Sequence, residues 1–132
     1  EEQRIAKAYA VLDLLEISHM AHNLASELSG GQSKLVDIGR ALMSSPQFLL
    51  LDEPVAGVAG PRAERIFQNL RSLTSDKGMS MLVIEHNMDF IFYSGGDRFV
   101  VMDRCRLLRE GMTDEVRQSR DVVEACLGDS TN

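Results

Sequence analysis

Two short motifs decide the fold of this chain: LSGGQ at residues 28–32 and FLLLDEP at residues 48–54. In the first motif, the Ser29 side chain can accept a hydrogen bond from the Gln32 N–H while the Gln32 side chain reaches back. This reciprocal pair is the capping box of a helix start. The two glycines between them have no Cβ, so a ligand can come close to their backbone. Because free N–H groups at a helix N-terminus attract anions, the motif predicts a phosphate-binding helix end, although taken alone it is equally typical of an ordinary capped helix.

The second motif predicts a strand that ends in two carboxylates. Residues 47–51 are mostly apolar, which is typical of a buried strand in a parallel sheet. Open α/β sheets bind their ligands beyond the carboxyl ends of the strands. Asp52 and Glu53 would therefore face a crevice, whereas the same pair without this context would be read as the polar start of a turn.

A third mark lies further along the chain, where the apolar strand predicted at residues 79–85 is followed by His86. A helix that begins at Gly60-Pro61 and runs to about Ser75 separates the two strands, so the order implies a right-handed crossover. His86 would then lie at the same edge of the sheet as the acidic pair. A lone histidine is more often structural, and Asn87 beside it could simply cap the next helix.

In combination, LSGGQ, the strand that ends in Asp-Glu-Pro and the strand that ends in Ile-Glu-His resemble the ATPases of ATP-binding-cassette (ABC) transporters in order and spacing. The resemblance covers essentially the whole chain. It implies an α/β fold, namely the C-terminal part of a P-loop NTPase domain of the ABC type, with parallel strands plus helices and the phosphate-loop strand missing. Finer marks at residues 52–57, 84–90 and 122–128 are most similar to the branched-chain amino-acid importer ATPases. Urea-import and lipopolysaccharide-export ATPases are near alternatives.

The resemblance implies that two nucleotide-binding subunits, identical or different, close over two ATP molecules. Each ATP would lie between the phosphate loop of one subunit and the LSGGQ helix of the other. The γ-phosphate would be contacted by Ser29, Gly30, Gly31 and Gln32. Closure and hydrolysis would drive transmembrane permease subunits, which places the protein at the cytoplasmic face of the cell membrane.

The resemblance also implies a role for each residue at the strand ends. Asp52 would hold Mg²⁺ through water, since this ion prefers oxygen ligands. Glu53 would polarise the attacking water as the general base. His86 would donate to the γ-phosphate and to that water. Such phosphoryl transfer depends mainly on positioning and on charge stabilisation.

Two departures from the family pattern stand out. The sequence contains no G-x-x-x-x-G-K-[ST] phosphate loop, and Ala59 stands where the family usually has an Asp that crosses to the partner subunit. The chain also begins without Met. We therefore expect the C-terminal part of a longer protein, inactive alone as an ATPase. Because the missing strand would lie mid-sheet, we expect self-association, an edge covered by another segment, or strands that pair across the gap.

Composition limits the alternatives. With 14 basic and 20 acidic residues, the net charge of −6 argues against nucleic acid as a partner. A DNA-repair or chromosome-organising ATPase would need a long heptad segment before LSGGQ, and residues 2–27 show none. The remaining alternative is a non-catalytic, truncated or orphan ABC-like protein that binds a partner. The missing loop and Ala59 favour it, and the intact motifs speak against it.

The predicted organisation has three parts: residues 1–45 as part of a helical subdomain with the signature helix, residues 46–128 as an α/β core, and residues 129–132 as a tail. Helices are predicted over residues 2–16, 29–44, 60–75 and 88–93, and from Thr113 and Asp121 onward. A hairpin is predicted from strands at 97–102 and 106–109, with a further turn at Glu110-Gly111. The spacing of Ile5, Ala8, Leu12 and Leu15 predicts a buried stripe on the first helix.

Overall fold

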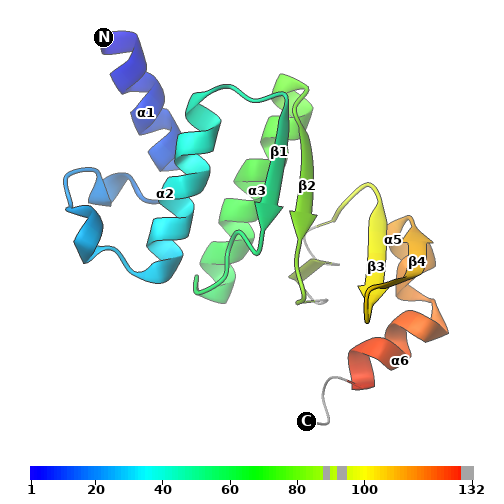
Figure 1. The fold of residues 1–132 in the computed structure, drawn as a ribbon. Coiled ribbons are helices and arrows are strands. Elements are labelled where there is room, and N and C mark those ends of the chain that lie inside the picture. The colour runs from blue at the N-terminus through cyan, green and yellow to red at the C-terminus, as the bar shows by residue number, and fades with distance from the viewer. Residues whose placement is uncertain (88–89, 92–94, 129–132) are drawn as a thin grey trace. The chain divides into compact units, whose positions relative to one another are not determined.

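The computed structural model of the chain describes residues 1–87, 90–91 and 95–128. The chain divides into two compact units, Glu1–Glu85 and His86–Asn132, and each has its own helices and strands (Figure 1). Among the described residues, no helix combines the length and the apolar character needed to cross a bilayer.

The first unit places helices around a pair of parallel strands. Its elements are α1 (Glu2–Leu14), α2 (Gly30–Met43), β1 (Phe48–Asp52), α3 (Gly60–Lys77) and β2 (Ser80–Ile84), with single 3₁₀ turns at Ser18–Met20 and Ala25–Glu27. Strands β1 and β2 pair in parallel, with Leu50 opposite Leu82 and Asp52 opposite Ile84. In Figure 1, α3 lies behind the strand pair, α2 lies beside it and α1 lies beyond α2. The predicted strand–helix–strand order is therefore confirmed.

The core of this unit forms between α2, β1 and α3. Its buried apolar side chains include Leu35, Ile38, Leu42, Leu49, Leu51, Ile66, Phe67, Leu70 and Leu73. On α3, the spacing of Ile66, Phe67, Leu70 and Leu73 along the sequence predicts an inner face, and all four side chains are buried. Helix α3 ends at Gly78, whose φ of 62° is the left-handed conformation that glycine adopts most easily at a helix end.

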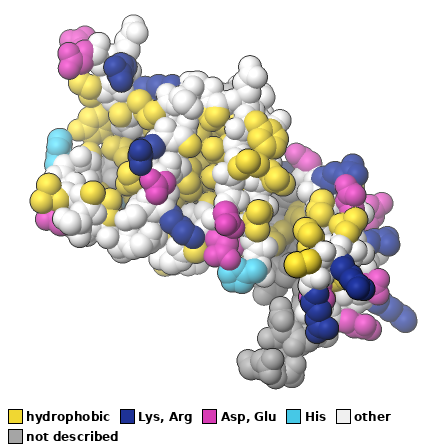
Figure 2. Space-filling view, in the orientation of Figure 1, with side chains coloured by type: hydrophobic (Ala, Val, Ile, Leu, Met, Phe, Trp, Pro, Cys, Tyr) yellow, Lys and Arg dark blue, Asp and Glu magenta, His cyan; other side chains and the backbone are white. Residues whose placement is uncertain are grey.

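The prediction of a buried strand at residues 47–51 is only half right. Leu49 and Leu51 are buried, but Phe48 and Leu50 are 56% and 68% exposed, and Leu82 is exposed on the same face of β2. Successive side chains of a strand point to opposite faces, and α3 covers only one face of this pair. Within the described part of the unit, the other face presents hydrophobic side chains at the surface (Figure 2).

The predicted stripe on α1 is confirmed in part, because Leu15 is buried and Ala8 and Leu12 are half-buried, but Ile5 is 52% exposed. Helices α1 and α2 lie side by side over only part of their lengths. Lys7 lies level with the end of α2, where its Nζ donates to the Met43 carbonyl at 2.9 Å. The residues before Lys7 therefore lie beyond the end of α2, and that helix does not cover them.

The second unit contains β3 (Phe99–Asp103), β4 (Arg106–Gly111), α5 (Thr113–Arg117) and α6 (Arg120–Gly128). Strands β3 and β4 form the predicted antiparallel hairpin. Its two turn residues, Arg104 and Cys105, have φ values of 46° and 61°, a conformation that suits Asn-Gly better. Among the described residues, β1 pairs with β2 and β3 pairs with β4 in separate two-stranded sheets.

Glu110 and Gly111 are the last residues of β4, where a turn was expected. The helix expected from Thr113 is α5, and the N–H of its N-cap residue Met112 donates to the Glu115 carboxylate at 3.0 Å. On α6, Val122 is buried and Val123 is 44% exposed. The predicted helix at residues 88–93 and the tail at 129–132 lie mostly or wholly outside the described residues.

Candidate functional site

The N-terminus of α2 forms the predicted capping box. The Gln32 N–H donates to Ser29 Oγ at 3.3 Å, and the Ser29 N–H donates to Gln32 Oε1 at 2.7 Å. Both side chains act within one turn, so the box is a local interaction at the helix start. A Cβ added at Gly30 would meet no atom within 4 Å, which leaves the backbone at this position open to a ligand.

Gly31 is a glycine for a different reason. A Cβ at Gly31 would lie 2.9 Å from the Gly57 carbonyl oxygen and 3.3 Å from the Ala56 oxygen. The turn that follows Glu53 therefore packs directly on the first turn of α2, and Gly57 makes that turn with a φ of 77°. The sequence assigned the space at both glycines to a ligand, but at Gly31 the chain itself fills it. No local pattern distinguishes the two positions.

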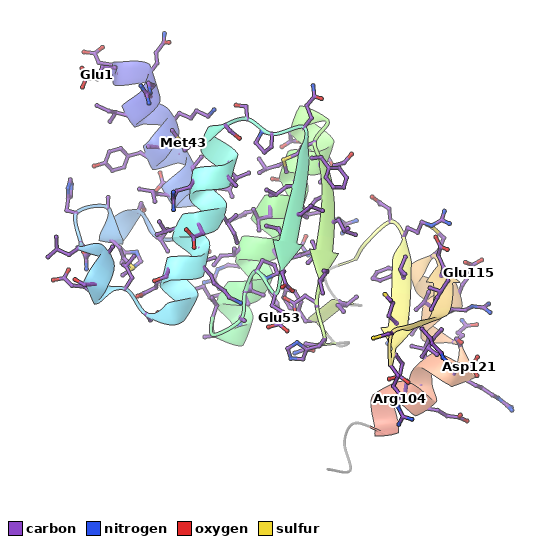
Figure 3. The ribbon with its side chains drawn as sticks, in the orientation of Figure 1. Glu1, Met43, Glu53, Arg104, Glu115 and Asp121 are labelled. Carbon is purple, nitrogen blue, oxygen red and sulfur yellow. The ribbon has the colours of Figure 1, made fainter. Side chains whose placement is uncertain are left out.

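Glu53 lies at the carboxyl end of β1 (Figure 3), and hydrogen bonds of its backbone hold it there. Its N–H donates to the Ile84 carbonyl at 2.9 Å, which extends the pairing with β2 by one residue. Its carbonyl accepts from the Lys34 Nζ at 3.3 Å and from the Ala56 N–H at 3.2 Å. With a φ of 45°, Glu53 has a conformation that costs a residue with a Cβ energy, and such strain clusters at functional sites. No sequence signal singled out Lys34.

Asp52 is the last residue of β1, and its side chain is exposed beside Glu53. Among the residues that the structure describes, no three His, Cys, Asp or Glu side chains gather as a protein-built metal site would need. A single exposed carboxylate nevertheless fits Mg²⁺, because this ion usually keeps several waters and takes other ligands from substrate phosphates.

His86 is exposed and follows the last residue of β2 by two positions, where the second unit begins. Asn87 Oδ1 accepts the Phe90 N–H at 3.0 Å. Within the first unit, the LSGGQ helix start packs on the turn that follows Asp52 and Glu53. The approach of His86 to the same phosphate stays a prediction.

Helix α3 begins directly after the turn that follows Glu53. Ala59 is its N-cap and provides no side-chain hydrogen bond to the helix. The departure from the family's usual Asp therefore has a local consequence as well as the implied loss of a contact with a partner subunit.

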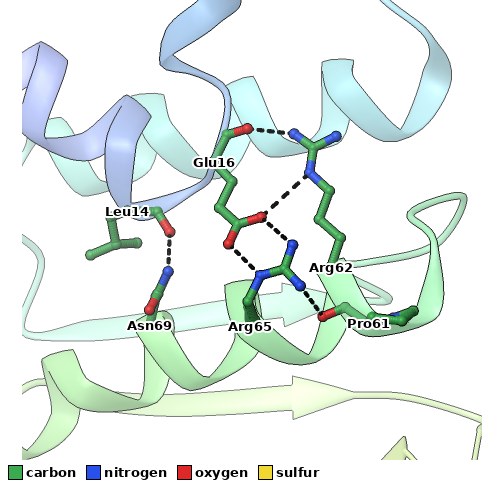
Figure 4. A network of polar contacts seen from close by, with 6 residues as sticks. All are labelled: Leu14, Glu16, Pro61, Arg62, Arg65 and Asn69. Carbon is green, nitrogen blue, oxygen red and sulfur yellow. Dashed lines mark hydrogen bonds and ion pairs between the residues drawn. The ribbon is translucent and has the colours of Figure 1, made fainter.

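A polar network that the sequence did not predict joins the end of α1 to α3 (Figure 4). Arg65 Nε and Nη2 donate to the two carboxylate oxygens of Glu16 at 2.8 and 3.1 Å. Arg62 donates to the Glu16 carbonyl and pairs with its carboxylate, and Asn69 donates to the Leu14 carbonyl at 2.9 Å. The hydrogen bond from Arg65 is the main cause that lowers the pKa of Glu16 below its usual value. The partners lie 46 to 55 residues apart, so no short-range pattern could reveal them.

Both a protein family model and individual curated proteins are similar in sequence to this chain. The family model described as "ABC transporter" matches residues 1–56. A probable branched-chain amino acid transport ATP-binding protein LivG of Methanocaldococcus jannaschii is 41% identical over 98% of this chain and 51% of its own length. The lipopolysaccharide export system ATP-binding protein LptB of Escherichia coli is 32% identical over 97% of this chain and 52% of its length.

Solved structures of ATP-binding cassettes are also similar to this chain. An ATP-binding cassette of an ABC transporter in its ADP conformation, MJ1267, is 40% identical with a TM-score of 0.76, over 97% of this chain and 51% of that one. The dimeric, post-hydrolysis cassette MJ0796, bound to ADP and Pi, is 28% identical with a TM-score of 0.76, over 86% of this chain and 48% of that one. The chain thus spans about half the length of these relatives.

Proposed function

Because this chain belongs to the ABC transporter ATPase family, we propose that it forms part of a nucleotide-binding subunit that couples ATP hydrolysis to transmembrane transport. The observation that carries the proposal is the packing of the LSGGQ helix start, through Gly31, on the turn at Gly57 that follows Glu53. Branched-chain amino acids are the proposed cargo, because the LivG relative is more similar to this chain than the LptB relative is.

The exposed end of α2 is the proposed contact for the γ-phosphate of an ATP molecule bound mainly by a second nucleotide-binding subunit. Ser29, Gly30, Gly31 and Gln32 would provide it. The first N–H groups of a helix lack partners inside the helix and carry the positive end of its dipole, so they favour phosphate. The open space at Gly30 lets the phosphate approach the backbone closely. The solved dimer of MJ0796 supports an arrangement with two cassettes.

The acids at the strand end are proposed to act on the ATP held by their own subunit. Asp52 would hold Mg²⁺ through water, and the ion would neutralise charge on the phosphate oxygens. Glu53 would orient and polarise the attacking water. Its backbone is held from three sides, by Ile84, Ala56 and Lys34, so the carboxylate starts from a fixed position. His86 would donate to the γ-phosphate and help to hold the water.

The proposed location is the cytoplasmic face of the membrane, where permease subunits would bind the pair of cassettes. The 132-residue sequence contains no phosphate loop, so the proposed ATP site needs a phosphate loop from outside these residues. We therefore expect the isolated chain to show no ATP turnover. Turnover by the purified chain that Glu53→Gln abolishes would overturn this expectation.

A fused cassette provides the test: this chain replaces the matching half of the M. jannaschii LivG relative. We expect ATP hydrolysis that Glu53→Gln lowers at least about a hundredfold, since a lost general base costs that much. Gly30→Ala should lower it roughly tenfold by displacing the phosphate. Asp37→Asn is the control, because Asp37 is an exposed side chain on the same helix.

A fused cassette that binds its partner but hydrolyses no ATP would instead support the non-catalytic alternative, which the missing phosphate loop and Ala59 favour. If Glu53→Gln and Asp37→Asn behave alike, the role proposed for Glu53 is wrong even though the cassette is active.

A further inference from the structure

The end of α1 is a turn that normally requires glycine. The Glu16 N–H donates to the Asp13 carbonyl at 3.0 Å, and the Ile17 N–H donates to the Leu12 carbonyl at 2.9 Å. These two bonds define the Schellman motif, in which the residue at the position of Glu16 has a left-handed backbone and is usually glycine. Glu16 has a φ of 55°, so a glutamate occupies a site that glycine would occupy with less strain.

Contacts with α3 explain the glutamate. The left-handed backbone turns both the carbonyl and the carboxylate of Glu16 toward α3 (Figure 4). The carbonyl accepts from Arg62, while the carboxylate binds Arg65 with both oxygens at 2.8 and 3.1 Å. Bidentate pairing of this kind fixes orientation as well as distance. The Glu16 side chain is 28% exposed, so it is partly sheltered from water.

These contacts complete a closed ring that includes the candidate site. The end of α1 packs on α2, because a Cβ added at Gly39 would lie 3.3 Å from Leu15 Cδ1. Leu15 directly precedes Glu16 in the chain. The start of α2 packs on the turn at Gly57. That turn leads into the first turn of α3, which contains Arg62. Glu16 closes the ring, and it adds to the Lys34–Glu53 hydrogen bond and to the Gly31–Gly57 contact that already join the start of α2 to the Glu53 turn.

We propose that Glu16 and Arg65 are positioning residues that fix the LSGGQ end of α2 relative to the turn after Glu53. The proposal deepens the proposed function and rests on it: the same subunit must present its LSGGQ end to one ATP and its Glu53 to the other. A loose ring allows the two ends to move independently, which lowers the fraction of closed dimers in which both ATP molecules are correctly placed.

The test compares Glu16→Gly with wild type in the fused cassette. Glycine relieves the backbone strain and removes the carboxylate, so the variant separates folding from positioning. We expect a melting temperature no lower than that of wild type, a roughly tenfold lower kcat, as expected for a small misplacement of reacting groups, and an unchanged KM for ATP. Arg65→Gln should reproduce the loss of kcat, and Glu16→Gln, which keeps the hydrogen-bonding shape, should recover part of it.

Asp37→Asn again is the matched control, because it breaks an ion pair with Arg40 on the exposed face of α2 and should leave kcat unchanged. Hydrogen exchange in the 132-residue chain gives an independent readout, with faster exchange expected at residues 32–35 in Glu16→Gly. A kcat of Glu16→Gly equal to that of wild type, or equal losses in Asp37→Asn, overturns the proposal. An inactive wild-type fused cassette overturns the proposed function instead, and the exchange rates then decide whether Glu16 fixes α2.

Discussion

The carbonyl oxygen of Gly57 lies 2.9 Å from the place where a Cβ on Gly31 would stand, so the two glycines let two backbones touch. A Cβ added at the neighbouring Gly30 would meet no atom within 4 Å. Gly31 therefore permits close packing within the subunit, whereas Gly30 leaves open space beside the backbone.

This pair predicts opposite effects on stability. Gly31→Ala should lower the free energy of unfolding by about 1–3 kcal/mol, because the methyl group meets backbone that cannot move easily. Gly30→Ala should leave it unchanged or raise it by up to about 1 kcal/mol, since alanine favours helix. Urea unfolding of the 132-residue chain measures both. Equal effects of the two substitutions would show that the turn at Gly57 does not pack on α2.

Glu53 predicts a conflict between stability and activity. Its φ of 45° is strained for any residue with a Cβ. Glu53→Gly should therefore be more stable than Glu53→Ala by about 1 kcal/mol, while both lack the carboxylate. Thermal unfolding of the two variants gives the difference, and neither should support hydrolysis in the fused cassette. A more stable alanine variant would contradict the strained backbone.

Ala59 predicts a gain from an added cap. Helix α3 has no side-chain cap at this position, so Ala59→Asp should raise the free energy of unfolding by about 1 kcal/mol. Ala59→Asn should give a similar gain without the charge, and Ala59→Val should give none. Denaturant unfolding compares the three variants. If valine stabilises as much as aspartate, the gain does not come from capping.

The alternation along β1 predicts unequal costs for neighbouring leucines. Leu51 is 6% exposed and Leu50 is 68% exposed. Leu51→Ala should cost about 2–5 kcal/mol of unfolding free energy, as for other buried leucines, and Leu50→Ala within about 0.5 kcal/mol. Chemical unfolding of the 132-residue chain measures both. A large cost at Leu50 would mean that something covers the open face, for example a second copy of the chain.

The Glu16 network predicts a defined pH dependence. The hydrogen bond from Arg65, with the charges of Arg65 and Arg62, lowers the folded-state pKa of Glu16 below its usual value of 4.5, against the opposing effect of desolvation. The resulting stabilisation is present above the unfolded-state pKa and is lost as pH falls through the lowered folded-state pKa. Glu16→Gln should therefore have a lower free energy of unfolding than wild type at pH 7, and this difference in the free energy of unfolding should become smaller below about pH 4. A gap that stays constant down to pH 2 would exclude this linkage.

Local patterns predicted the elements well. The capping box at Ser29, the buried face of α3 around Ile66 and the parallel pairing of β1 with β2 all follow from rules that act within a few residues. The errors have the opposite origin. Ile5 and Leu50 have the spacing of buried residues, but burial also requires a second element that covers them. Helix α2 does not extend as far as Ile5, and α3 covers the opposite face of the strand from Leu50.

By itself, the sequence determined which family the motifs resemble, where the helix start and the acidic strand end lie, and which faces are apolar, because caps and periodicity are properties of neighbouring residues. Only the tertiary structure decided that Gly31 meets Gly57, that Lys34 reaches the strained Glu53, and that Glu16 binds Arg65. Each of these contacts joins residues far apart in the chain, and such partners are set by how whole helices and strands pack, which no short stretch of residues specifies.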